Sequence, residues 1–201
     1  MPPTNPNDGG KWGLMGGVFD PVHYGHLILA ETAYQECNLD GVMFLPSLDP
    51  PHRQNKPIAA FEDRMMMARL AVESNENFMA SDLEKELASP GYTLAVVELL
   101  EQRYSKADWY LILGADNIAI FDTWHKPEEL ADRVNIIVGN RPGYDADFNN
   151  SVWFDKVERF NMPLIEIAAT DIRRAISEAK SVRYRIPDEV RNFIDKKGLY
   201  R

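Results

Sequence analysis

The stretch GGVFDPVHYGHL, Gly16 to Leu27, gathers residue types that could bind phosphate groups. Gly16 and Gly17 follow an apolar run, and the absence of side chains there lets a phosphate approach the backbone closely. His23 and His26 stand three positions apart at the expected start of a helix, so both imidazoles should lie on one face. The amino end of that helix offers N–H groups and a positive dipole to an anion. The stretch therefore predicts an anion-binding site where a strand becomes a helix.

Two histidines at this spacing also allow other interpretations. A zinc site needs a third or fourth ligand at a suitable spacing, and the lone Cys37 is a poor candidate for one. A dinucleotide-binding dehydrogenase would carry G-x-G-x-x-G and a P-loop enzyme G-x-x-x-x-G-K-S/T, and neither motif occurs. A glycine turn followed by a histidine-capped helix, with no ligand at all, is the remaining alternative.

The composition of the chain limits the kinds of partner that it can bind. Of its 201 residues, 22 are Lys or Arg and 31 are Asp or Glu, which gives a net charge of −9 and argues against non-specific binding to nucleic acid. An anionic ligand then needs a local positive pocket. The single cysteine excludes an intrachain disulfide, no apolar run is long enough to span a membrane, and the opening MPPTNPNDGG lacks the segments of a signal peptide. We expect a cytoplasmic protein without nucleic-acid or membrane partners, and its oligomeric state stays open.

Apolar runs alternate with helical patterns along the chain. Strands are predicted at residues 12–19, 42–46, 78–82, 109–114, 134–138 and 164–168, and helices at 24–37, 60–74, 93–104, 126–132, 170–179 and 187–197. This alternation predicts an α/β fold with a doubly wound parallel sheet, whose ligand site lies beyond the carboxyl ends of the strands at the switch point. Residues 142–161 are weakly patterned and are expected to form a surface loop. We expect residues 1–10 to be a flexible tail and 11–201 a single domain, with 169–201 a C-terminal helical subdomain.

The motif G-x-F-D-P-x-H-x-G-H resembles the signature of the nucleotidylyltransferase superfamily, in which (H/T)-x-G-H binds a nucleotide triphosphate and stabilises the transition state of nucleotidyl transfer. Within that superfamily the chain resembles the bacterial nicotinate mononucleotide adenylyltransferases. The matching stretches are PPHR (50–53), GYT (91–93), LGAD with FDTW (113–124), RPG (141–143), ATDIRR (169–174), YRIPDEV (184–190) and GLY (198–200). Their order and spacing agree over almost the whole length, so the resemblance implies a Rossmann-like nucleotidylyltransferase fold.

The resemblance also implies roles for individual residues. It assigns catalysis to His23, His26 and Arg173, with His26 as the central residue. His52 and Arg53 are expected to join them in neutralising phosphate charge. It assigns ATP binding to Gly16, Gly17, Val18, Phe19, His52, Arg53, Gly114, Asp116, Arg141, Thr170 and Ile172. Asp116 would orient a ribose hydroxyl or a water, although a helix cap is a rival interpretation.

The acceptor substrate is assigned to Tyr92, Thr93 and Trp124. In the family the GYT segment binds the nicotinate carboxylate, and N–H donors there would distinguish the acid from its amide, whose NH₂ would face other donors. The family also places a tryptophan against the pyridine ring. His125, beside Trp124, is interpreted as a surface residue.

Two positions depart from the family pattern. Ala168 stands where a serine is usual before the ATDIRR segment, and Val18 stands where threonine is common in the first motif. Ala168 removes a hydroxyl donor from an expected phosphate contact, whereas Val18 matches threonine in shape and lacks only its hydroxyl. Backbone N–H groups, Thr170 and Arg173 remain as candidate donors.

These assignments predict adenylyl transfer from ATP to nicotinate mononucleotide, which gives nicotinate adenine dinucleotide and pyrophosphate in NAD biosynthesis. The reaction needs no nucleophilic side chain, because it proceeds by positioning two anions in line and neutralising phosphate charge. Mg²⁺ is expected to arrive with ATP, since no carboxylate cluster forms a dedicated metal site, and Asp20 is expected to accept backbone N–H bonds in its turn. The alternatives are a related enzyme that uses nicotinamide mononucleotide or pantetheine phosphate, and a non-catalytic nucleotide-binding protein.

Overall fold

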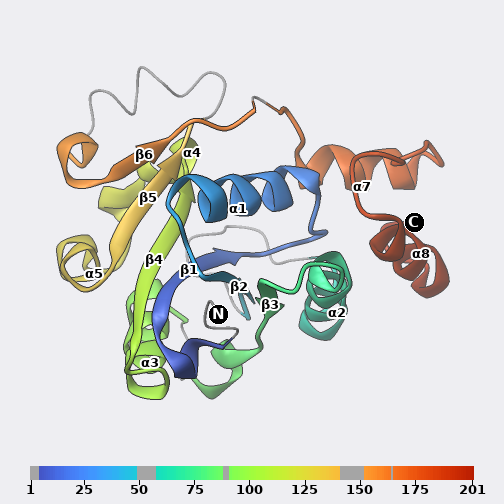
Figure 1. The fold of residues 1–201 in the computed structure, drawn as a ribbon. Helices are drawn as coiled ribbons and strands as arrows, with labels where there is room; N and C mark the ends of the chain where they lie inside the picture. The colour runs from blue at the N-terminus through green and yellow to red at the C-terminus, as the bar shows by residue number, and fades with distance from the viewer. Residues whose placement is uncertain (1–4, 49–57, 88–90, 141–151, 164) are drawn as a thin grey trace.

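The computed structural model describes residues 5–48, 58–87, 91–140, 152–163 and 165–201 (Figure 1). Its strands are β1 Gly10–Gly17, β2 Gly41–Pro46, β3 Phe78–Ala80, β4 Ala107–Gly114, β5 Asn135–Gly139 and β6 Glu158–Phe160. Its α-helices are α1 Tyr24–Glu36, α2 Phe61–Val72, α3 Thr93–Arg103, α4 Ala115–Ile118, α5 Pro127–Arg133, α7 Ala169–Ser177 and α8 Asp188–Lys197. Short 3₁₀ turns cover Pro6–Asp8, Leu83–Glu86, Phe121–Thr123 and Phe154–Lys156.

The six strands form one parallel sheet in the order β3-β2-β1-β4-β5-β6. The chain builds outward from β1 in one direction and then from β4 in the other, so the switch point lies between these two central strands. In the register, Gly17 at the end of β1 lies opposite Pro46 of β2, and Gly114 at the end of β4 lies opposite Gly139 of β5. The predicted doubly wound parallel sheet is confirmed.

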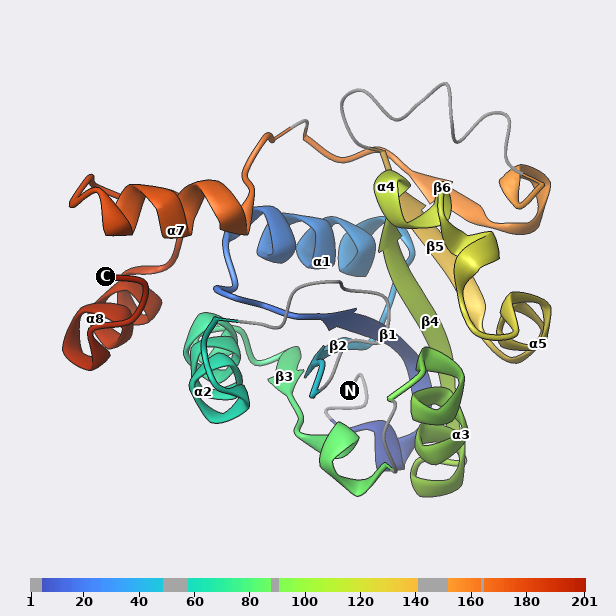
Figure 2. The same ribbon diagram turned by 180° about the vertical axis from the view of Figure 1, so that it is seen from behind.

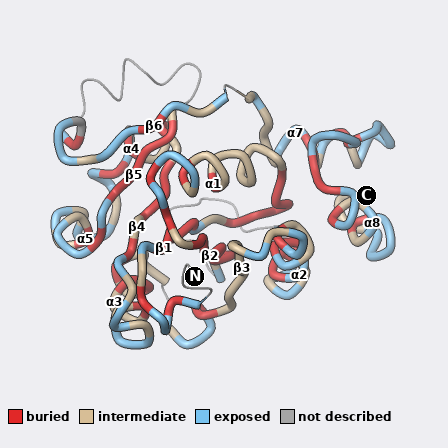
Figure 3. The backbone as a smooth tube through the Cα atoms, in the orientation of Figure 1, coloured by how far each residue is buried: buried red, intermediate tan, exposed pale blue. Residues whose placement is uncertain are grey.

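Helices cover both faces of the sheet because its strands are apolar on both sides. Along β1, Trp12 and Leu14 belong to the apolar cluster under α3 and α5, whereas Met15 belongs to the cluster under α1 and α2. This alternation is the two-residue period of a strand buried on both faces. Figure 2 shows α1 and α3 on opposite faces, and Figure 3 shows that burial is concentrated in the central strands β1, β2, β4 and β5.

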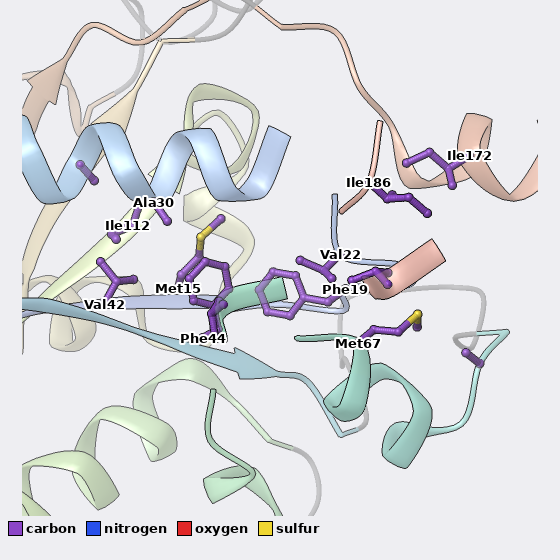
Figure 4. Packing of buried hydrophobic residues seen from close by; sticks show 14 of the residues in the cluster. Met15, Phe19, Val22, Ala30, Val42, Phe44, Met67, Ile112, Ile172 and Ile186 are labelled. Atoms are coloured by element: carbon purple, nitrogen blue, oxygen red, sulfur yellow. The ribbon is translucent and has the colours of Figure 1, made fainter. Parts of the chain in front are cut away.

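The closing helices α7 and α8 lie within the predicted helical part 169–201. Ile172 of α7 is buried in the same cluster as Met15 (Figure 4). Val190 and Ile194 of α8 are buried in this cluster too. Lys197 of α8 also lies 3.1 Å from Asp63 of α2. This packing fixes the position of α7, which begins beside the head of α1 (Figure 1).

The last strand differs from the predicted one. Residues 165–168 form no strand, residue 164 lies outside the described residues, and the sixth strand is Glu158–Phe160, inside the region interpreted as a loop. Strand β6 is an edge strand with only Phe160 buried, so it lacks the apolar run that marks the central strands. At the other end, Pro6–Asp8 forms a 3₁₀ turn and β1 already begins at Gly10. No helix within the described residues is long and apolar enough to cross a membrane.

Candidate active site

Two cavities open at the carboxyl ends of β1 and β4, where the switch point lies. Their volumes are about 370 and 360 Å³, within the range of small-molecule sites. The residues that line both cavities are Gly16, Gly17, Val18, Leu113, Asp116, Asn117 and Trp124. The two cavities are therefore neighbours, and two ligands could meet across the end of β1.

The end of β1 is open because it carries no side chain. A Cβ added to Gly16 would meet no heavy atom within 4 Å, so the backbone there faces open space. At the end of β4, a Cβ on Gly114 would lie 2.6 Å from the carboxylate oxygen Oδ1 of Asp116. Glycine at 114 thus leaves room for the carboxylate of Asp116 where it lines both cavities. The N-cap of α4 is Gly114 itself, so Asp116 is not the cap.

The two histidines of the opening motif lie against each other at the head of α1. Their ring centroids are 3.6 Å apart in a stacked arrangement, and both line the first cavity. His23 is the N-cap with extended φ and ψ of −148° and 169°, and His26 is at position N3, so only His26 lies within the helix as predicted. A Cβ on Gly25 would come within 3.0 Å of Nδ1 of His23, which explains the glycine between them.

Hydrogen bonding fixes the proton of the His26 ring. Its Nδ1 accepts the backbone N–H of His23 at 3.2 Å, so in the neutral imidazole the proton is on Nε2. The ring of Phe19 packs edge-on against it with centroids 5.0 Å apart. His26 therefore presents a donor, and Nε2 in this tautomer has no lone pair with which to attack phosphorus.

The backbone at the head of α1 offers fewer donors than the sequence suggests. The N–H of Tyr24 donates to the carbonyl of Arg185 at 2.9 Å, and the N–H of His26 donates to the carbonyl of His23 at 2.9 Å. The first turn carries no acidic residue that would repel an anion. The imidazoles, more than the amides, make this helix end suitable for phosphate.

Arg173 reaches the same cavity from α7. Its Nη1 donates to the backbone carbonyl of Asp20 at 2.7 Å and its Nη2 to Oγ1 of Thr170 at 3.3 Å. Among the described residues no carboxylate forms an ion pair with Arg173, so its charge is available to an anion in the cavity. The predicted convergence of His23, His26 and Arg173 on one cavity is thus present in the structure.

The amino end of α7 completes this side of the cavity. Ala168 is its N-cap and makes no side-chain cap bond, which is the structural result of the missing serine hydroxyl. Ala168, Ala169 and Thr170 all line the first cavity, as do Ile165 and Ile167 of the segment that was predicted to be a strand. The segment 165–168 therefore borders the cavity instead of extending the sheet.

Asp20 is buried beneath the first cavity and is already bound. With 4% of its surface exposed, it accepts the N–H groups of Ile58 at 2.8 Å and Ala59 at 3.2 Å, and the hydroxyl of Tyr200 at 2.6 Å. It does accept backbone N–H bonds as predicted, but from residues just before α2 and not from its own turn. Over the part of the chain that the structure describes, no three His, Cys, Asp or Glu residues gather as a metal site.

Cys37 takes no part in either cavity. It lies in the apolar cluster under α1, and burial, the larger cause, together with Glu158 and Glu36 raises the pKa of its thiol to about 11. A thiol with that pKa is neutral near pH 7 and is a poor nucleophile there.

The second cavity has a different character. Gly91, Thr93, Glu84 and Trp124 line it, and none of its described lining residues is Lys, Arg or His. Glu84 is 6% exposed, and its Oε2 accepts the N–H of Leu48 at 2.8 Å. Burial raises the pKa of Glu84 to about 7, against the opposing effects of the Leu48 hydrogen bond and the charge of Arg64. The cavity thus combines an aromatic ring, a helix start and a weakly acidic carboxyl.

The remaining predicted residues differ in their placement. Val18, Phe19, Gly114 and Thr170 line the first cavity and Thr93 the second. Tyr92, the N-cap of α3, lines neither cavity; its ring stacks on that of exposed His125 with centroids 4.1 Å apart.

Ile172 is fully buried in the apolar core and also lines neither cavity, so its side chain is structural (Figure 4). His52, Arg53 and Arg141 lie outside the described residues.

Some lining residues were not predicted from the sequence. Glu84, Ser47, Asn117 and Ile120 border the second cavity. Asn117 and Ile120 had a signal, because both lie within the stretch 113–124 that follows β4 and matches the family. Ser47 and Glu84 lie in connections whose position depends on the folded sheet.

Comparison with known proteins gives consistent results. The sequence model of the cytidylyltransferase-like family matches residues 14–177. A protein of Thermomicrobium roseum named probable nicotinate-nucleotide adenylyltransferase is 38% identical over 196 residues, which cover 95% of this chain and 92% of that protein. The nicotinate-nucleotide adenylyltransferase of Bacillus subtilis is 36% identical over 190 residues, covering 94% of this chain and 98% of the relative.

Solved structures share the fold. A Plasmodium falciparum nicotinic acid mononucleotide adenylyltransferase complexed with NaAD superimposes with a TM-score of 0.78 at 18% identity, covering 94% of this chain and 97% of that one. The same enzyme complexed with APC gives a TM-score of 0.77 at 17% identity, covering 95% and 97%. At these identities the similarity establishes the arrangement of the sheet and helices.

Proposed function

Because the chain belongs to the cytidylyltransferase-like family and, within it, to the nicotinate-nucleotide adenylyltransferases, we propose that it transfers the adenylyl group of ATP to nicotinate mononucleotide. The products are nicotinate adenine dinucleotide and pyrophosphate, and the reaction is a step of NAD biosynthesis. The observation that carries the proposal is the meeting of His23, His26 and Arg173 in one cavity at the switch point of an otherwise acidic protein.

The first cavity suits the triphosphate of ATP. A triphosphate carries several negative charges, and this cavity holds a guanidinium and two imidazoles with no carboxylate paired to the guanidinium among the described residues. The second cavity suits the pyridine mononucleotide, since it offers the flat ring of Trp124 and the start of α3 at Thr93. A carboxylate at that helix start meets N–H donors, whereas an amide would place its own NH₂ against them.

The proposed reaction is a single displacement. An oxygen of the 5′-phosphate of nicotinate mononucleotide forms a bond to the α-phosphorus of ATP, and the bond from that phosphorus to the pyrophosphate oxygen breaks. The attacking oxygen is already anionic, so no base has to remove a proton. Nε2–H of His26 and the guanidinium of Arg173 stabilise charge on the phosphate oxygens, as donors aimed at a developing oxyanion do.

Nucleotidyltransferases of this family use a divalent metal with ATP. We take the ion to be Mg²⁺, bound to the phosphate oxygens and mostly hydrated, as part of the substrate. The described residues fit that arrangement because they offer no carboxylate cluster: the carboxylate of Asp20 already accepts three hydrogen bonds from the protein.

A panel of acceptors tests the proposal. Pyrophosphate release is measured with ATP and Mg²⁺ in the presence of nicotinate mononucleotide, nicotinamide mononucleotide or pantetheine phosphate. We expect release with the nicotinate compound to be the fastest. Preference for the amide would contradict the assignment of the second cavity, and binding of ATP without turnover of any acceptor would identify a non-catalytic nucleotide-binding protein.

A further inference from the structure

The penultimate residue of the chain touches the motif at the head of α1. The hydroxyl of Tyr200 donates to Oδ1 of Asp20 at 2.6 Å across 180 positions of sequence. Asp20 lies three positions before His23 and belongs to the lining of the first cavity. We propose that Tyr200 is a positioning residue of the triphosphate site and acts on Arg173 through Asp20. This inference rests on the proposed function only for the identity of the reaction that is measured.

Asp20 connects four separate parts of the chain. Its Oδ2 accepts the N–H of Ile58 and its Oδ1 accepts the N–H of Ala59 and the hydroxyl of Tyr200. Its backbone carbonyl accepts Nη1 of Arg173 at 2.7 Å. The loop that carries the opening motif, the residues before α2, the C-terminal segment and α7 are therefore fixed relative to one another at a single residue.

A buried carboxylate needs all of these donors. Removal of an ionised group from water is costly unless hydrogen bonds replace the lost hydration, and Asp20 is 4% exposed. Two of its three side-chain bonds come from neighbouring amides, and the third comes from Tyr200 alone. Without that hydroxyl the carboxylate would have to turn toward another donor, and its own backbone carbonyl, which orients Arg173, would move with it.

The C-terminal segment is shaped to place this hydroxyl. α8 ends at Gly198 in the left-handed conformation, and the N–H of Leu199 returns to the carbonyl of Ile194 at 3.1 Å. Tyr200 itself has a φ of 64°, a conformation that is strained for a non-glycine residue and persists only where its surroundings hold it. Its ring packs partly buried against the apolar cluster that contains Phe19.

The hydroxyl is a permanent donor. Burial, then the hydrogen bond and negative charge of Asp20, raise the pKa of Tyr200 far above its ordinary value, while Arg173 and Arg64 lower it by less. The phenol is therefore protonated near neutral pH, and its hydrogen bond to Asp20 serves to fix geometry.

The test compares two tyrosines of the C-terminal part. In Tyr200→Phe the ring remains and only the hydroxyl is lost, so we expect kcat/KM for ATP to fall about tenfold, the size of one hydrogen bond to a charged group. The KM for nicotinate mononucleotide should stay nearly unchanged. The matched control is Tyr184→Phe, because Tyr184 also has a left-handed backbone, with φ of 67°, but is 83% exposed. This control should behave like the unmodified protein.

A double-mutant cycle separates positioning from folding stability. If Tyr200 acts through the carboxylate, Tyr200→Phe should cause no further loss of kcat/KM for ATP in an Asp20→Ala background, where no side-chain oxygen remains to accept its hydroxyl. A lower melting temperature with unchanged kinetics, or equal losses in both backgrounds, would overturn the inference. Equilibrium titration with ATP provides a readout that does not depend on the acceptor. Absence of turnover in the unmodified protein would contradict the proposed function instead.

Discussion

The two cavities share the open end of β1 yet are lined by different kinds of side chain. The first is lined by the imidazoles of His23 and His26 at the head of α1 and by the guanidinium of Arg173 from α7. The second has no Lys, Arg or His among its described lining residues and holds instead Trp124 and the half-neutral carboxyl of Glu84. The first cavity therefore suits a ligand that is bound through its charge. The second suits a ligand that is bound through its shape, the packing of its ring and the polarity of its hydrogen bonds.

This difference matches the chemistry of the two substrates. A triphosphate is bound mainly through its charge, and in a protein with a net charge of −9 that charge must be met locally. A pyridine ring carries little charge, so its recognition uses aromatic area and a few directed donors. Loss of a phosphate donor in the first cavity should therefore reduce the rate strongly, whereas changes in the second cavity should alter stability and acceptor choice.

The largest effect is expected at His26. His26→Ala removes the Nε2 donor while the protein stays folded, and kcat should fall by about 10²–10³, as for one donor to a developing oxyanion. Steady-state kinetics measure the fall in kcat, and the circular dichroism spectrum of the same sample shows whether the variant is folded. His26→Gln is the matched variant, because its amide can place an N–H near the lost Nε2. It should recover part of the rate, and near-normal turnover by His26→Ala would remove the proposed role.

The buried carboxyl of the second cavity gives a pH effect of similar free energy. The pKa of Glu84 in the folded protein is about 7, above the ordinary 4.5, so the folded state binds the proton more tightly than the unfolded chain. The contribution of Glu84 to the free energy of unfolding is therefore fully present below pH 4.5. It is lost as the pH rises through 7, and the total loss is about 3 kcal/mol. Glu84→Gln should flatten that part of the profile.

Urea unfolding at pH 5 and pH 8 measures this difference. The unmodified protein should lose more free energy of unfolding between the two pH values than Glu84→Gln does. Equal losses in both proteins would show that Glu84 does not titrate in this range.

Two neighbouring arginines of α7 sharpen the contrast between charge in a cavity and charge at the surface. Arg173→Ala should lower kcat/KM for ATP by about a hundredfold, since it removes a guanidinium held in the first cavity. Arg174→Ala should have little effect, because Arg174 is exposed and pairs with Asp171. Similar losses in both variants would mean that the general charge of the helix, and not the placement of Arg173, is responsible.

The smallest effect is expected at the N-cap of α7. Ala168→Ser restores a hydroxyl where the N-cap now has no side-chain bond, and the free energy of unfolding should rise by about 1 kcal/mol. The same hydroxyl faces the first cavity, so the KM for ATP should fall slightly. Thermal unfolding and ATP kinetics check the two effects, and a lower melting temperature would show that the cap geometry does not admit the hydroxyl.

Some parts of the fold and of the candidate site could be predicted from the sequence, and others could not. The central strands and the head of α1 could be predicted because long apolar runs and a dense local motif specify them in consecutive residues. Strand β6 could not, since an edge strand with one buried side chain leaves little periodic signal. Arg173 was identified only through the family resemblance, because nothing local distinguishes it from Arg174.

Long-range contacts were beyond prediction from the sequence. Glu84 borders the second cavity only because a short turn after β3 packs beside the end of β2. The bond from Tyr200 to Asp20 depends on where α8 ends relative to the first motif. Such contacts are fixed by tertiary packing, so residue types and local spacing do not reveal them.

The central claim is that Nε2–H of His26 donates a hydrogen bond to the phosphates and that His26 does not itself attack phosphorus. The direct measurement uses ATP made chiral at its α-phosphorus and follows the configuration of that centre in the dinucleotide formed with nicotinate mononucleotide. A single in-line displacement inverts the configuration, and this is the result that the hydrogen bond from His23 to Nδ1 of His26 predicts. Retention, which requires two displacements and an adenylylated side chain, would contradict it.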